Sequence, residues 1–138
     1  MEYIMEKVSI KTAEKEVKAW ADYKKIDETK REENKEQLAK LAEAISLGHL
    51  SYDSKEHFLV QKVKFPLGEG ATAVTELKYK ARLKMNEVTA RTKNVKPSDT
   101  YGLITAYVCA LTDQNSGILG GLDSEDNRIA QAIAVFFL

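Results

Sequence analysis

The sequence predicts an α+β fold with an N-terminal helical hairpin or long helix, an antiparallel β-hairpin and about three C-terminal helices. Residues 11–47 contain no Gly or Pro and are rich in Ala, Glu, Lys and Leu, which favour helices. Near residue 50 the composition changes, and the segments that follow carry the β-branched and aromatic residues of strands. We therefore expect a helical N-terminal region over residues 1–50 and an α+β domain over residues 51–138.

The N-terminal region contains two apolar stripes at helical spacing, separated by a polar segment. Thr12 is the expected N-cap of the first helix. The stripes are formed by Val17, Trp20 and Ala21, and by Leu38, Leu41, Ala42 and Ile45. Residues 27–37 contain no apolar side chain, so this segment cannot pack on a core. One long helix with a solvated middle fits this pattern, as does a hairpin bent near residues 27–34, which we favour. Gly48 is the expected left-handed stop.

The β-hairpin is predicted from two short runs around a turn. Residues 58–65 are β-branched and aromatic, and residues 66–70 contain the Pro and Gly of a turn. Thr75, Leu77, Tyr79 and Ala81 then alternate with polar or exposed positions, which is the period of a strand with one buried face. A lone hairpin is marginal, so its apolar face must lie on helices or extend into a larger sheet.

The C-terminal third is predicted to be helical. Residues 84–93 form a short helix, and Ser98 or Asp99 caps a second helix over residues 100–111, which should be the most buried. Residues 112–121 read as a Gly-containing loop. The acids from Asp123 to Asp126 resemble a capping box that opens the last helix. The apolar side of that helix carries Ile129, Ala132, Ile133 and Phe136.

Charge and composition exclude several classes of function. The 21 basic and 21 acidic residues balance, so the basic excess of nucleic-acid-binding proteins is missing. No run of about 18 apolar residues would span a membrane, and the N-terminus has no apolar signal-peptide core, although Met5 is an alternative start to Met1. The single cysteine, Cys109, lies in an apolar run and is expected to be a buried hydrophobe in a reducing compartment.

No arrangement of residues predicts an active site, a metal site or a cofactor. His49 and His57 lack further ligands at suitable spacing, so we interpret them as surface residues. The acids at residues 123–126 lack the order of a calcium loop and are better explained by helix capping. No nucleophile, base and oxyanion site can be assembled. We therefore expect a non-enzymatic protein.

Two features favour protein binding. The charged helical region suits either solubility or an arm that pairs with another helix. Residues 135–138 are consecutively apolar and cannot all lie on one helix face, so they either complete the core or meet a partner. The residues that we expect to contact a partner are Trp20, Leu38, Leu41, Ile45, Phe136 and Phe137.

Residues 58–138 resemble the tail assembly chaperones of Mu-like and related long-tailed bacteriophages. The resemblance is carried by Phe65-Pro66-Leu67, Val74-Thr75-Glu76-Leu77, Pro97-Ser98-Asp99, Gly121-Leu122-Asp123-Ser124-Glu125-Asp126 and Phe136-Phe137-Leu138. In that family a β-hairpin is followed by helices, and the chain closes with a Leu–x–x–x–Asp element and a phenylalanine-containing helix. Leu122 and Asp126 occupy that element here.

The resemblance implies a protein of the host cytoplasm that coats the tape measure protein and helps tail-tube subunits assemble around it. Such chaperones are not enzymes, and self-association into a homo-oligomer would help one small domain to cover a long client. No direct contact with nucleic acid or membrane is expected. Two other functions stay open: a structural virion protein of the tail or connector, and a small phage regulator that binds a host protein.

Overall fold

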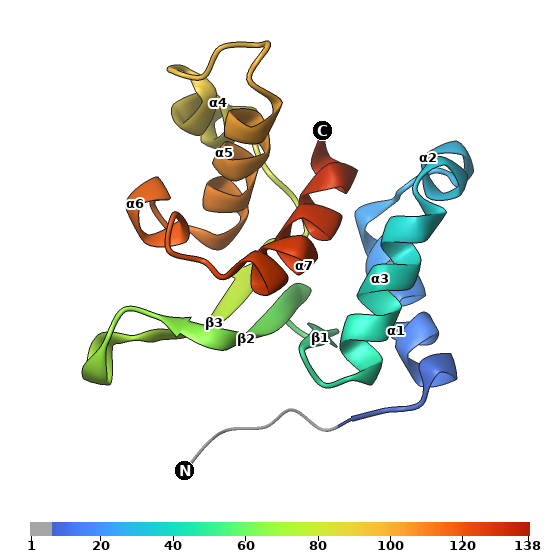
Figure 1. The fold of residues 1–138 in the computed structure, drawn as a ribbon. Coiled ribbons are helices and arrows are strands. Elements are labelled where there is room, and N and C mark those ends of the chain that lie inside the picture. Colours follow the sequence, from blue (N-terminus) through green and yellow to red (C-terminus); the bar gives the residue numbers. More distant parts are fainter. Residues whose placement is uncertain (1–6) are drawn as a thin grey trace.

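The computed structural model describes residues 7–138, so both candidate start positions, Met1 and Met5, lie outside the described residues (Figure 1). The helices are α1 (Ile10–Lys24), α2 (Glu28–Glu33), α3 (Lys35–Ser46), α4 (Met85–Thr92), α5 (Thr100–Thr112), α6 (Ser116–Leu119) and α7 (Ser124–Ala134). The strands are β1 (Leu50–Asp53), β2 (Phe58–Leu67) and β3 (Val74–Tyr79), with short 3₁₀ helices η1 (Gly70–Thr72) and η2 (Val135–Phe137). This architecture confirms the α+β prediction.

The N-terminal region is a helical hairpin, as we favoured, and not one long helix. Lys25 ends α1 in the left-handed conformation, with φ of 60°. Asp27 then caps α2 by accepting the Lys30 N–H at 2.8 Å. The predicted cap of α1 was wrong: Ser9 is the N-cap, because its extended backbone lets its hydroxyl oxygen accept the Thr12 N–H. Gly48 does adopt the expected left-handed conformation after α3, with φ of 82°.

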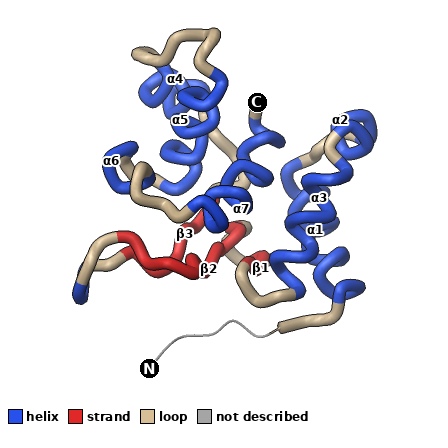
Figure 2. The backbone as a smooth tube through the Cα atoms, in the orientation of Figure 1, coloured by secondary structure: helices blue, strands red, loops and turns tan. Residues whose placement is uncertain are grey.

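The three strands of the described residues form one antiparallel sheet in the order β1-β2-β3. The predicted β2–β3 hairpin is confirmed, with Leu59 opposite Tyr79. β1 was not predicted, and it pairs Leu50 with Gln61 and Asp53 with Phe58. It provides the larger sheet that an isolated hairpin needs. Figure 2 shows the tip of the β2–β3 hairpin projecting beyond the helices.

Helix α7 lies at the centre of the fold and packs on α3, α5 and β2 (Figure 1). One hydrophobic core therefore joins residues from both sides of the expected boundary at residue 50. Trp20 of α1 meets Phe136 of η2 edge to face, with ring centroids 5.6 Å apart. The core also contains Leu41, Ile45, Leu50, Leu59, Leu77, Leu111 and Ile133.

A buried polar network fixes α7 to the sheet. The pairing of β2 with β3 shifts register between Lys62 and Leu67, which leaves backbone donors without strand partners. The Asp126 carboxylate accepts the N–H of Lys64 at 2.9 Å and of Phe65 at 3.1 Å. Asp126 is thus a buried acceptor, and our assignment of it to a capping box is corrected. Asp123, the first residue of that predicted box, does cap α7, because its carboxylate accepts the Glu125 N–H at 2.9 Å.

Gln61 and Tyr79 extend this network across the sheet. The Gln61 amide donates to the Asp126 carbonyl at 2.9 Å, and the Tyr79 hydroxyl donates to the Gln61 side-chain oxygen at 2.6 Å. Burial, and then the negative charge of Asp126, raises the pKa of the Tyr79 hydroxyl far above its usual range. Tyr79 therefore remains a hydrogen-bond donor, and each buried polar side chain of the network has a partner.

The predicted helices near residues 84–93 and 100–111 and at the C-terminus correspond to α4, α5 and α7. The short α6 lies within residues 112–121, where we expected only a loop. Asp99 caps α5 by accepting the Gly102 N–H at 2.9 Å. Helix α5 is not the most buried helix that we expected, since five of its 13 residues are buried against five of the 11 in α7. Its first residues are exposed or half-buried, with Tyr101 76% exposed, and its buried residues begin at Ala106.

Candidate functional site

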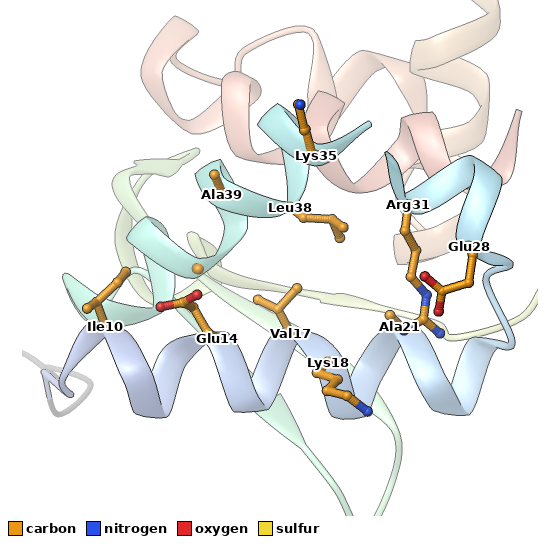
Figure 3. A pocket seen from close by; sticks show the side chains of 11 residues that line it. Ile10, Glu14, Val17, Lys18, Ala21, Glu28, Arg31, Lys35, Leu38 and Ala39 are labelled. Carbon is orange, nitrogen blue, oxygen red and sulfur yellow. The ribbon is translucent and has the colours of Figure 1, made fainter. Parts of the chain in front are cut away.

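An open apolar groove of about 610 Å³ lies between α1 and α3 and is bordered by α2 at one end (Figure 3). Val17 and Leu38 point into the space between the two helices in this view. The groove exists because several facing positions are alanine, so the helices touch without filling the gap between them. The alanines that line it are Ala21, Ala39 and Ala42.

Charged side chains form the rim of this α1–α3 groove. The Asp22 carboxylate forms ion pairs with two side chains, with Lys18 Nζ at 2.8 Å and with Arg31 Nη1 at 3.0 Å. The hydrogen bond from Lys18, followed by that from Arg31, lowers the pKa of the Asp22 carboxyl. Glu14 and Glu28 also line the groove, and their side chains have no ion pair or hydrogen bond within residues 7–138. Within this part of the chain, Glu14 and Glu28 are the unpaired charges of the rim, whereas the cations that line it, Lys18, Arg31 and Lys35, each pair with an acid.

The structure separates the six expected contact residues into two groups. Trp20, Leu41, Ile45 and Phe136 are at most 2% exposed, so they are core residues and are not accessible to a partner in this conformation. They are buried because α7 and η2 return against α1 and α3. Leu38 and Phe137 are half-buried. Leu38 lines the α1–α3 groove, and the Phe137 ring lies 3.5 Å from Lys24 Nζ.

Sequence reasoning missed several residues that line the groove. Ile10 is 49% exposed at one end, and Ala39 is exposed on α3. Ala39 lies one residue after the Leu38 stripe and could have been read as its edge. Nothing in the sequence indicated that the two stripes would leave a groove open between them.

The two histidines lie in different surroundings. His49 is half-buried, and burial, followed by the charge of Lys64, lowers the pKa of its imidazole. The ring of His57 packs on Tyr23 with centroids 3.6 Å apart, and its Nδ1 lies 3.2 Å from the Tyr52 hydroxyl. These contacts give His57 a packing role between the β1–β2 turn and α1. Among residues 7–138, no three His, Cys, Asp or Glu side chains gather as metal ligands would.

Cys109 is 3% exposed, and burial raises the pKa of its thiol. A buried thiol with a raised pKa is a poor nucleophile, in agreement with the expectation of a small hydrophobe. None of the helices in the described part of the chain combines the length and the apolar character needed to cross a bilayer. Comparison with protein-family models, with curated proteins and with solved structures found no match to this chain.

Proposed function

We propose that this protein is a non-enzymatic phage tail assembly chaperone that binds an amphipathic helix of the tape measure protein in the α1–α3 groove. The resemblance of residues 58–138 supports the class of function. The observation that supports the binding mode is an open apolar groove bordered by unpaired acids. In the host cytoplasm the chaperone would cover apolar stripes of its client until tail-tube subunits replace it.

The groove favours one kind of occupant. Leu38 and Ala39 offer accessible apolar side chains, and Val17, Ala21 and Ala42 form a buried floor beneath them, which suits an apolar helix stripe that packs into shallow holes. Glu14 and Glu28 on the rim would pair with Lys or Arg beside that stripe. We therefore expect client segments whose apolar stripe is bordered by basic residues.

The groove offers a client no large aromatic side chain as an anchor, which suits a temporary complex. The largest aromatic side chain nearby, Trp20, is buried in the core and is not offered to a client. Tight interfaces usually depend on a few such anchors in deep pockets. Contacts through Ala, Val and Leu alone give modest affinity, so that assembling tube subunits can displace the chaperone by mass action.

The Leu–x–x–x–Asp element, formed here by Leu122 and Asp126, is one of the motifs that carry the resemblance, and it has a structural role in this chain. The carboxylate of Asp126 accepts two backbone N–H groups where β2 leaves its regular pairing with β3. Asp126, four residues after Leu122, therefore stabilises the β-hairpin where its regular pairing ends. This role links the closing helix to the hairpin, the two parts that the resemblance covers.

Co-expression with the tape measure protein of the same phage genome tests the proposal. We expect the two proteins to co-purify, and Ala39→Glu to abolish recovery by placing a charge in the groove. Ala90→Glu is the matched control, because Ala90 is an exposed helical alanine on α4 and lies outside the groove. Failure to recover the tape measure protein, or equal recovery with both variants, would contradict the proposal. Abundant protein in purified virions would instead favour a structural tail or connector component.

A further inference from the structure

A second cavity, of about 380 Å³, lies beside the last residues of the chain, between the α1–α2 segment and α5. Lys24 at the end of α1, Lys30 of α2 and Arg82 from the β3–α4 connection all line it. Tyr107 of α5 and Phe137 of η2 are also part of its wall. Among the described residues, no Asp or Glu side chain lines this cationic cavity.

None of the three cations pairs with an Asp or Glu side chain of the described residues. Lys24, Lys30 and Arg82 form no ion pair with any Asp or Glu within residues 7–138, although other lysines of the chain do. Lys30 lines the cavity, and its Nζ already donates to a main-chain oxygen of Leu138, the last residue of the sequence, at 3.1 Å. Lys24 Nζ lies 3.5 Å from the centre of the Phe137 ring. Arg82 has no hydrogen bond or ion pair in the described part of the chain, so its guanidinium is available.

The position of Lys24 is electrostatically unfavourable. Burial, and then repulsion from Lys30 and Arg82, lowers the pKa of its ammonium group to about 8. Three like charges that converge from separate segments repel one another unless an anion lies between them. The ring of Phe137 faces this ammonium group, but its quadrupole carries no net charge and does not neutralise the three cations.

We propose that the cationic cavity binds a doubly charged tetrahedral oxyanion, such as inorganic phosphate or the phosphate group of an ester, through Lys24, Lys30 and Arg82. A dianion best balances three cations, and a guanidinium can donate two parallel hydrogen bonds to phosphate oxygens. The Tyr107 side chain in the wall adds a further possible donor. This site is distinct from the α1–α3 groove and does not depend on the proposed function.

Sulfate is the probe for the test because its charge stays constant between pH 6 and pH 9, unlike that of phosphate. At constant ionic strength, we expect saturable NMR shifts of the Lys24, Lys30 and Arg82 signals. The titratable groups that line the cavity with Lys24 are Lys30, Arg82 and Tyr107. Since the pKa of Lys24 is about 8, its protonated fraction falls about tenfold between pH 7 and pH 9. Sulfate affinity should fall by about the same factor.

Two substitutions and a control complete the experiment. Lys24→Met should weaken sulfate binding by about tenfold or more and remove its dependence on pH between 7 and 9. Arg82→Met tests the same site at an exposed position, where the fold does not depend on the side chain. Lys96→Met makes the same change of charge in an exposed loop and should leave binding unchanged.

Three results would overturn the assignment. One is the absence of saturable shifts at constant ionic strength. Another is sulfate binding that is equally weakened by Lys96→Met, which would indicate general charge screening. The third is acetate binding as tightly as sulfate, which would identify a carboxylate site instead of a phosphate site.

Discussion

The indole of Trp20 and the phenyl ring of Phe136 meet edge to face, with ring centroids 5.6 Å apart. Both side chains are almost fully buried, although they come from the first helix and the last turn of the described chain. The contact therefore fastens the N-terminal hairpin to the C-terminal end. Residues that we expected to face a partner instead hold the two regions together.

Truncation of either ring should destabilise the protein strongly. We expect Trp20→Ala and Phe136→Ala each to lower the free energy of unfolding by about 3–5 kcal/mol, because each leaves a large cavity. A double-mutant cycle in urea should give a coupling of about 0.5–1.5 kcal/mol for the ring pair. Tyr101→Ala, at a position that is 76% exposed, should change stability by less than about 0.5 kcal/mol. If Trp20→Ala and Phe136→Ala lowered the free energy of unfolding by no more than Tyr101→Ala does, the burial of the two rings in the core would be contradicted.

Asp126→Asn and Asp123→Asn should affect stability differently, because the two acids near the start of α7 have different roles. The amide can accept from only one of the Lys64 and Phe65 N–H groups, so one buried donor is left unpaired. We expect a loss of about 1–3 kcal/mol and faster hydrogen exchange at residue 64 or 65. Asp123→Asn is the control, since Asn caps helices as well as Asp and should be nearly neutral. Equal losses of stability from the two substitutions would contradict the pairing of Asp126 with two buried N–H groups.

Lys24 should lower stability at neutral pH. Its pKa is about 8 in the folded protein against 10.5 in the unfolded chain, so the unfolded state binds more protons between these values. Stability contributed by this group therefore rises with pH from about 8 to 10.5. In buffer without sulfate or phosphate, we expect Lys24→Met to have a higher urea midpoint than the wild type at pH 7. The difference should narrow by pH 10, and a difference that widened would contradict the depressed pKa.

Glu87 should show a dependence of the same sign, but in the acid range, because its folded-state pKa is also lowered. The hydrogen bond from Lys80, at 2.6 Å, and then that from the Lys84 N–H, lowers the pKa of the Glu87 carboxyl. The stability from this group is present above 4.5, the ordinary pKa of a glutamate in the unfolded chain, and is lost as pH falls through the lower folded value. Glu87→Gln should cost less than about 1 kcal/mol at pH 7, because the pair is partly exposed. Urea titrations should show the two proteins converging at low pH, whereas a constant difference would argue against the ion pair.

Local signals account for the parts of the fold that could be predicted. Gly48 marks the end of α3, and the acid at residue 123 marks the start of α7, because capping depends on neighbours in the sequence. β1 was missed because four residues are too few to show a period of two, and its strand character comes from pairing with β2.

The sites depend on tertiary structure and were less accessible to prediction. An apolar stripe such as the one around Leu41 indicates which face is buried, but not whether its own chain or a partner covers it. The cationic cavity combines Lys24 and Lys30 with Arg82, which lie in different regions of the sequence. Only the return of η2 and the β3–α4 connection toward α1 brings them together.

The chain contains a single tryptophan, and the fold places it where the first helix meets the last turn. Its intrinsic fluorescence therefore reports on that junction with no background from other indoles. An emission maximum that moves to longer wavelength would signal water reaching the ring, whether through global unfolding or through local separation of the first helix from the last turn. One optical measurement can thus follow global stability and the integrity of this junction without a label.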